Sequence, residues 1–520
     1  MAVVHTDVHG SARVRRRVRG SATVLALLLL MVFVTLGMVL AATSLQAVVL
    51  TRTQQRSSMA FSLAESGAER ALRYLRVQAS PPAGNGAFAP FGSTPIALGS
   101  GTYAVEIDPD DDNASATLKR YVVRSTGRAL GRQETIELYV RMSTFGAYAF
   151  FFDRWPPGAF LDNNSVVDGP AHVNGSDGVP MLLRWSTSAA NPIFQRGLFT
   201  TALNSISYLS PSVAPTTEAE YQKIFELGSA GYRLGVSTIS LPPSTSTQQA
   251  AAWGSSSGFP GTDGVYVPAT GSICSSGIYM RGSFDRMLFR VTAPTTQVIE
   301  LWQSGRNWTI TIDRSANTTR ILENNGGGPA NITNLTGVPN GAIYCSGDIL
   351  DLSGQLADSY VSGGTVVSRN AFTLSTDTAA GRDITVTSDI RYRTPPSNTE
   401  DWDSTTNLTA ATLGLVSDEV RIAATAPTNF RIDATMVCGR PGANGKFWAP
   451  TYATKTPAGT VQVFGGVVAN EAGITATTRP SGWYDSYYYD LRLRSNPPPY
   501  FPTTGLYQRL SFRRTSAGAG

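Results

Sequence analysis

Residues 21–50 contain no charged side chain, and this run limits what the chain can fold into. As an α-helix the run would be roughly 45 Å long at 1.5 Å per residue, whereas the hydrocarbon core of a bilayer is about 30 Å thick. Five arginines lie between residues 13 and 19, and the first twenty residues hold a single acid, Asp7. Because basic flanks stay in the cytoplasm, the run predicts one membrane span with an internal N-terminus and export of everything after about Arg52.

The alternative is a secretory signal peptide cut near Ala41 or Ala42. The apolar segment of such a peptide is about 7–15 residues, and this run is about twice as long, which favours the membrane span. The whole chain carries a net charge of +5, of which the basic leader contributes +4. The exported part is therefore nearly neutral, which weakens any general attraction to nucleic acid.

The helical pattern continues beyond the membrane. Larger apolar side chains recur there, and a set of small residues provides a second face; the small residues are Ala60, Ala64, Gly67, Ala68 and Ala71. Pro81 and Pro82 then end the pattern. The sequence predicts one helix from about Ala22 to Val77, half in lipid and half outside it.

The segments 19–22 and 64–72, separated by the Leu-rich run, resemble the N-terminal region of PilX-type pilus assembly proteins, which are minor-pilin relatives in type IV pili. The resemblance implies that a prepilin peptidase cuts after Gly20, that Ser21 becomes the N-terminus, and that the helix packs against other pilin subunits. Many pilins carry Glu at the fifth mature position, where this chain has Leu25. That departure fits an accessory or terminal subunit better than a major pilin.

Three runs beyond the helix alternate apolar and polar residues in places, as half-buried antiparallel strands do: Tyr103–Ile107, Arg120–Arg124 and Glu134–Arg141. They predict a β-meander against the upper helix. Between the first two runs, residues 108–113 are acidic. Asn113 and Lys119 stand where a calcium-binding loop of the EF-hand type needs Gly and Glu, so a solvated turn is favoured over a metal site.

Short β-rich runs separated by Gly and Asn recur from about Phe150. Ile349, Val366 and Ile384 lie 17 and 18 residues apart, and Leu415 and Ile432 lie 17 apart. Such recurrence predicts a parallel β-helix, or solenoid, with a large β-sandwich as the alternative. The predicted fold class is therefore mainly β with a long N-terminal α-helix.

The predicted domains follow from these patterns. They are a basic leader (1–20), a transmembrane half-helix (21–50), an extramembrane half-helix (51–78), a linker with the meander (79–142), an irregular β-rich region with a short helical insert (143–340), and a β-solenoid with a C-terminal cap (341–515).

The exported part carries a second resemblance, to the large extracellular region attached to PilX-type N-termini. The matching segments are 168–175, 343–348, 414–418, 489–492 and 497–502. Some of those proteins resemble the large competence pilins of the ComZ type, in which a β-solenoid on a pilin head is proposed to meet DNA. This resemblance implies a binding module beyond the pilin head.

Few residues in the exported part suggest catalysis. His172 is the one histidine after Gly20, and no nucleophile elbow, phosphate-binding loop or dinucleotide motif accompanies it. The three cysteines are far apart, which gives no metal or redox motif and leaves open whether two of them pair; they are Cys274, Cys345 and Cys438. No cofactor or metal is expected, and the chain is not expected to be an enzyme.

An exported carbohydrate-active β-helix enzyme is the alternative from a different class. Its catalytic carboxylates would come from the aspartates of the C-terminal half: Asp348, Asp351, Asp383, Asp389, Asp401 and Asp403.

Arginines and aromatic residues near the C-terminus can hold single-stranded nucleic acid by phosphate contact and stacking. The candidate contacts are Arg391, Arg393, Arg492, Arg494, Arg513, Arg514, Tyr487 and Tyr488. The alternative is that the arginines pair with acids while the aromatics cap the solenoid. The sequence thus predicts a minor-pilin-like protein of the bacterial inner membrane whose solenoid binds DNA or a surface glycan, with DNA uptake as the leading role and adhesion next.

Overall fold

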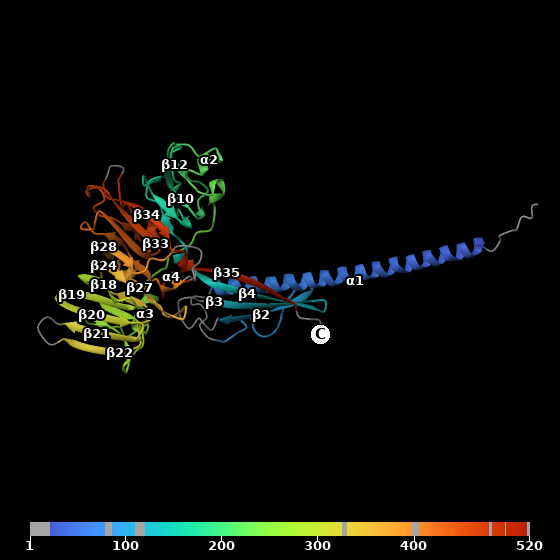
Figure 1. The fold of residues 1–520 in the computed structure, drawn as a ribbon, viewed down its shortest axis with the longest axis horizontal. Coiled ribbons are helices and arrows are strands. Elements are labelled where there is room, and N and C mark those ends of the chain that lie inside the picture. Colours follow the sequence, from blue (N-terminus) through green and yellow to red (C-terminus); the bar gives the residue numbers. More distant parts are fainter. Residues whose placement is uncertain are drawn as a thin grey trace, which may run out of the picture.

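The structure is a computed structural model that describes residues 21–77, 86–109, 120–324, 330–397, 405–477, 481–494 and 496–516 (Figure 1). Helix α1 (Ser21–Val77) runs through 57 residues without a break. Leu, Ala, Val and Met dominate its first half, and the helix contains no proline, so helix propensity is high along its length. The predicted single helix is confirmed; the leader and the proline pair lie outside the described residues.

The first half of α1 projects away from the rest of the protein (Figure 1). Every large apolar side chain from Val24 to Leu50 is between 48% and 70% exposed. α1 is the one described helix that is long and apolar enough to cross a membrane, with a mean hydropathy of 2.9 in its most apolar window. Such a surface is unfavourable in water and is compatible with a membrane anchor.

The second half of α1 packs on a five-stranded antiparallel sheet, and together they form the head. The sheet order is β1 (Ile96–Leu98), β2 (Gly101–Pro109), β3 (Arg120–Ala129), β4 (Arg132–Thr144) and β35 (Thr503–Ser516). The three predicted runs lie in β2, β3 and β4. Ala60, Ala64 and Ala71 are fully buried beneath the sheet, so the predicted small-residue face is the one that docks.

Gly127 of β3 sets how closely helix and sheet approach. A Cβ atom at this position would lie 2.0 Å from the carbonyl oxygen of Ala60 and 2.6 Å from the amide nitrogen of Ala64. Both are backbone atoms of α1, which cannot move aside without separating the helix from the sheet.

We therefore expect Gly127→Ala to destabilise the head by about 2–3 kcal/mol through overpacking. Urea unfolding of the purified chain in detergent would measure this loss. Gly86→Ala is the matched control, because a Cβ at Gly86 meets nothing within 4 Å. Equal unfolding midpoints for the two variants would contradict the close packing.

Strand β35 returns from the far end of the chain to complete the head. It pairs antiparallel with β4, from Thr503 opposite Thr144 to Ser516 opposite Glu134. The prediction that placed residues 503–515 in the cap of the solenoid is wrong. The physical reason is that β4 would otherwise be an open edge, and β35 covers it while burying Tyr507 against Tyr121.

The rest of the protein, here called the body (residues 145–502), is built mainly from parallel strands. One ladder runs through ten strands in the spatial order β17 (Ile278–Arg281), β23 (Ala342–Cys345), β27 (Ala371–Thr376), β29 (Thr412–Ser417), β31 (Asn429–Cys438), β33 (Gly459–Glu471), β5 (Phe150–Arg154), β8 (Ala171–Val173), β11 (Phe199–Thr201) and β13 (Tyr232–Arg233).

A second parallel ladder lies beside the first. Its strands are β18 (Arg286–Ala293), β24 (Ile349–Leu356), β28 (Ile384–Tyr392), parts of β31 and β33, β34 (Trp483–Tyr489), β7 (Val166–Asp168) and β10 (Phe194–Gln195). Each coil buries apolar side chains against the next, and one continuous core fills the interior. The predicted fold class, a helix and meander followed by a parallel β-helix, is confirmed.

The chain enters this β-helix in its middle. From β5 the coils run outward to β13, and the chain then crosses to the opposite end at β17 and coils back until β33 pairs with β5. The two halves of the body therefore meet at a seam between β33 and β5.

The true coil is about twice the predicted spacing. Ile349 pairs in parallel with Ile384, 35 residues later, and Ile384 pairs with Val420, 36 residues later. Val366, which suggested the shorter period, lies in the hairpin of β25 (Tyr360–Ser362) and β26 (Thr365–Ser368) outside the ladders. Strands of the coils and strands of the hairpin both alternate apolar and polar residues, so the spacing of apolar residues alone does not distinguish a coil strand from a hairpin strand.

The remaining elements extend the body. An antiparallel meander continues from β18 through β19 (Thr296–Gln303), β20 (Arg306–Asp313), β21 (Thr318–Asn324) and β22 (Asn331–Thr336). The other strands are β6 (Leu161–Asp162), β9 (Leu182–Arg184), β12 (Ser207–Ser210), β14 (Gly264–Tyr266), β15 (Ala269–Thr270), β16 (Ile273–Cys274), β30 (Val420–Ile422) and β32 (Phe447–Trp448). Among the described residues of the body, short α-helices are α2 (Glu218–Tyr221), α3 (Ser246–Trp253) and α4 (Thr405–Thr409), and single 3-10 turns lie at Phe145–Ala147, Gly228–Gly231, Thr378–Ala380 and Leu491–Arg494.

Candidate nucleic-acid interface

The predicted nucleic-acid contacts do not form one surface. Arg391 and Arg393 lie at the end of β28, and Tyr487 and Tyr488 lie in β34. Arg492 and Arg494 belong to the short turn that follows β34, whereas Arg513 and Arg514 belong to β35 of the head. The pattern of arginines and aromatics is therefore spread over three parts of the fold.

Two of the predicted contacts are buried and cannot reach a ligand at the surface. Arg492 is 4% exposed and forms an ion pair of 2.6 Å with Asp490. Tyr487 is 3% exposed and donates its hydroxyl hydrogen to the carboxylate of Asp485. These two residues are part of the core and pair with acids, so they do not contribute to a binding surface.

Most of the other predicted cations are paired. Arg391 contacts Asp389 at 3.2 Å, Arg393 contacts Asp358 at 2.5 Å, and Arg514 contacts Glu134 at 3.0 Å. Arg494 is exposed, with its guanidinium 5.8 Å from the centre of the Tyr489 ring. Arg513 is exposed on β35, and Tyr488 packs partly buried against the core.

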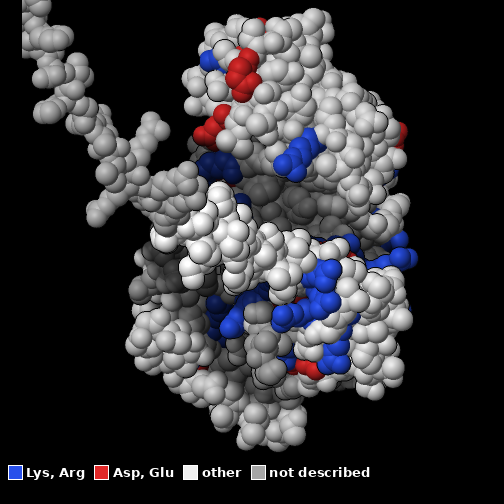
Figure 2. Space-filling view, turned by 90° about the vertical axis from the view of Figure 1, so that its right-hand side faces the viewer, with Lys and Arg blue, Asp and Glu red and all other residues white. Residues whose placement is uncertain are grey.

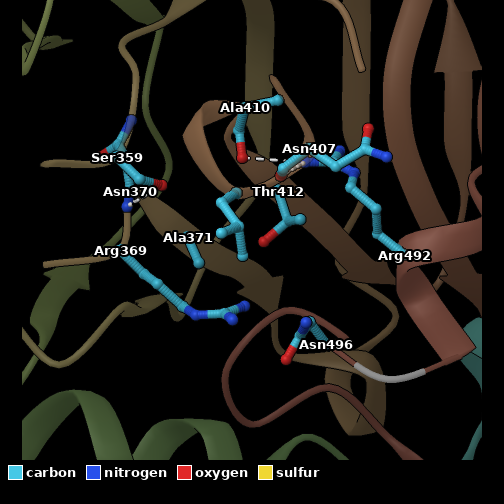
Figure 3. A pocket seen from close by; sticks show the side chains of 10 residues that line it. Ser359, Arg369, Asn370, Ala371, Asn407, Ala410, Thr412, Arg492 and Asn496 are labelled. Carbon is cyan, nitrogen blue, oxygen red and sulfur yellow. Dashed lines mark hydrogen bonds between the residues drawn. The ribbon is translucent and has the colours of Figure 1, made fainter. Parts of the chain in front are cut away.

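An arginine that the prediction omitted, Arg369, lies with Arg492 beside a narrow pocket of about 10 Å³. Figure 3 shows the two arginine side chains entering from opposite sides, with Asn496 between them. Arg492 donates to the carbonyl oxygens of Ala410 at 2.8 Å and Ala411 at 3.0 Å, so backbone groups and Asp490 fix its position. Arg369 forms no ion pair with the part of the chain that the structure describes.

A second pocket, of about 240 Å³, lies where the head meets the body. Arg141 of β4 and Arg494 line it, together with Gln508 of β35. Burial lowers the pKa of Arg141, and the charge of Arg120 lowers it further. Arg369 keeps exposed surface, but the protein atoms around its guanidinium displace water and lower its pKa, with Arg492 and Arg120 adding repulsion. Together these arginines make the junction of head and body electropositive, a setting that suits an anion.

Charge divides sharply between head and body. Residues 51–144 and 503–520 hold fourteen basic and nine acidic side chains, a net charge of +5, whereas residues 145–502 hold twenty-three basic and twenty-seven acidic side chains, a net charge of −4. Seen from the end where α1 projects, basic side chains gather beside the helix on the lower part of this face (Figure 2). A polyanion would therefore be attracted to the head and the junction and repelled by the body as a whole.

The aspartates proposed for catalysis join arginines along the coils. Asp348 pairs with Arg382 at 3.3 Å, and Asp383 pairs with Arg421 at 2.7 Å. Burial raises the pKa of Asp383 to about 6. Asp351 likewise contacts an arginine, at 3.4 Å, and Asp389 pairs with Arg391. These carboxylates connect neighbouring coils, while Asp401 and Asp403 lie outside the described residues.

His172 is a core residue. It lies in β8, is 1% exposed, and stacks on Phe151 with ring centres 5.1 Å apart. Its Nδ1 atom lies 2.8 Å from the hydroxyl of Thr200, and its Nε2 atom lies 2.8 Å from the side-chain oxygen of Asn174. Burial lowers the pKa of His172.

The three cysteines are free thiols in this structure. Cys345 and Cys438 are buried, and burial raises the pKa of Cys345 to about 12. Among the described residues no group of three or more His, Cys, Asp or Glu side chains is placed to hold a metal ion. Most of the acidic segment 108–113 lies outside them.

No protein-family model matches the chain, and no curated protein matches its sequence. In structure, the chain is similar to the competence-associated pilin ComZ from Thermus thermophilus, known from its crystal structure. The two share 11% sequence identity with a TM-score of 0.30 over 88% of this chain and 98% of that one.

Proposed function

We propose that this protein is a pilin-like subunit of a type IV pilus or a related filament system. The observation that carries the proposal is α1: its exposed apolar half is long enough for a bilayer, and its other half is docked on the head without a break between them. An exposed apolar rod requires cover from lipid or from other helices. A pilin-like subunit meets both requirements, because lipid surrounds its apolar half-helix in the membrane and neighbouring helices surround it in the filament.

N-terminal sequencing of the mature protein from its own membrane tests this proposal. We expect the first residue to be Ser21, after removal of the leader by a prepilin peptidase, and we expect the protein to remain in the membrane or filament fraction. Gly20→Leu should leave the leader attached. A mature protein that begins near Ala42 or Thr43 would have lost the apolar half of α1, and the filament role would be excluded.

We further propose that the body is exported and acts as a binding module, with DNA uptake as its specific role. The electropositive junction supports this role, because Arg494 is exposed at the pocket that Arg141 lines, and Arg369 is exposed at the narrow pocket that Arg492 lines. The basic head adds to the same region. The proposed interface thus moves from the solenoid cap to the junction of head and body. Adhesion to a surface glycan is the second proposal.

A salt titration of single-stranded DNA binding by the full chain in detergent tests the DNA proposal. We expect Arg369→Gln/Arg494→Gln to weaken binding and to reduce the slope of log Kd against log salt by about 1.4, because each lost phosphate contact contributes roughly 0.7. Arg233→Gln/Arg320→Gln removes the same charge from exposed positions in the body and is the matched control. Equal effects of the two double variants would show that only net charge matters.

A further inference from the structure

A cleft of about 460 Å³ opens on the body at the seam where its two halves meet. Its lining comes from residues 155–165 after β5, from residues 472–477 after β33, and from the start of β34. Tyr452 and Arg184 complete it. The cleft therefore exists only because the chain enters the β-helix in its middle and brings these loops together.

Aromatic side chains from separate parts of the sequence line the cleft. Phe160, Tyr452 and Tyr484 are partly exposed there. Trp155 lies deeper, at 3% exposure, and its indole nitrogen donates to the carbonyl oxygen of Ala159 at 2.7 Å. Partly exposed aromatic rings in a concave site provide flat apolar faces for a ligand.

Carboxylates and amide groups lie among these rings. Asp162 accepts a hydrogen bond of 2.9 Å from the backbone nitrogen of Asn164, and Asp485 accepts one from the hydroxyl of Tyr487. Burial raises the pKa of Asp485, and the charge of Asp162 raises it further, so the two carboxyl groups act on each other. Arg184 lies over the ring of Phe160 at 5.6 Å, at one side of the cleft.

We propose that this cleft binds a short oligosaccharide that is neutral or carries amino or acetamido groups. A sugar ring has an apolar face that stacks on aromatic rings and an edge of hydroxyl groups that hydrogen bonds with carboxylates and amides. The volume lies within the range of sites for small ligands, about 300–1,000 Å³. The lining holds two carboxyl groups and one arginine, so it attracts an acidic polymer less than the basic junction does.

This proposal is independent of the filament role and gives the proposed adhesion to a surface glycan a specific site. The test uses the full chain in detergent with three probes: cellohexaose, chitohexaose and an acidic oligogalacturonide. Quenching of tryptophan fluorescence and isothermal calorimetry would report binding. We expect one or both of the first two probes to bind and the acidic probe not to bind.

Tyr484→Ala should weaken the binding about tenfold, as truncation of a central aromatic contact commonly does. Asp162→Asn should weaken it with little change in stability, because the residue remains able to accept hydrogen bonds. Trp302→Ala is the control, since Trp302 lies on β19 in the meander and does not line the cleft. Failure of both cellohexaose and chitohexaose to bind, or equal losses in Tyr484→Ala and Trp302→Ala, would overturn the proposal, whatever the outcome of the sequencing and DNA experiments.

Discussion

A chain shortened to end at residue 502 is expected to lose its folded head while it keeps the body. The deletion removes β35, whose register with β4 extends over ten residue pairs. It also removes Tyr507, which is 6% exposed beside Tyr121, and Phe512, whose ring contacts Phe61 of α1. Loss of these contacts and of one edge strand should cost about 5 kcal/mol or more, which approaches the total stability of a small domain.

Limited proteolysis of the purified chain in detergent would measure this effect. We expect cleavage within β2–β4 of the shortened protein under conditions that leave the full chain intact, while the coils of the body resist. A chain that ends at residue 516 retains β35 and is the matched control. If the chain ending at residue 502 resists protease as well as this control, β35 is not required for the head.

The second large effect is expected at Arg492. Replacement by Met would leave the buried carboxylate of Asp490 without its partner and would remove donors from the carbonyl oxygens of Ala410 and Ala411. Breaking a buried ion pair from one side commonly costs about 3–5 kcal/mol, because the remaining charge stays desolvated. Arg492→Met should therefore lower the urea midpoint of the body markedly.

Arg391→Met is the matched control for this substitution. Its side chain is 47% exposed and pairs with Asp389, so the loss should be below about 1 kcal/mol. Arg492→Met/Asp490→Asn should recover part of the stability, because the unpaired charge is gone. A double variant no more stable than Arg492→Met would mean that the carbonyl contacts, not the ion pair, carry the effect.

Local patterns predicted the elements whose structure is decided locally. α1 and the runs in β2, β3 and β4 follow from apolar periodicity and alternation over short stretches. Local patterns do not predict that β35 pairs with β4. The paired residues Ser516 and Glu134 are separated by most of the chain, and many other strands could pair with the open edge of β4. The order of the coils has the same difficulty, since neighbours such as β33 and β5 are more than three hundred residues apart.

The candidate site could have been predicted more closely from one signal that was overlooked. On a strand, residues i and i+2 face the same side, so an acid two positions from an arginine predicts a pair. Asp389 with Arg391, Glu419 with Arg421 and Asp433 with Arg431 follow this rule. Asp490 with Arg492 has the same spacing just beyond β34. The spacing identifies which arginines are paired with acids. It does not show that Arg494 and Arg141 line one pocket at the junction, because that depends on how the head meets the body.

The entry and exit of the body give the head a defined way to carry load. The chain leaves β4 at Thr144 and returns into β35 at Thr503, and these two residues are opposite each other in the ladder. The strands of the head lie along α1, with the body beyond their far end (Figure 1). Tension between a ligand held by the body and a filament holding α1 would thus enter two adjacent strands at the same level and pull them in the same direction. The two strands would therefore not slide past each other. The force would be distributed over the hydrogen bonds of the sheet and transmitted to α1, and the bonds would not break one after another.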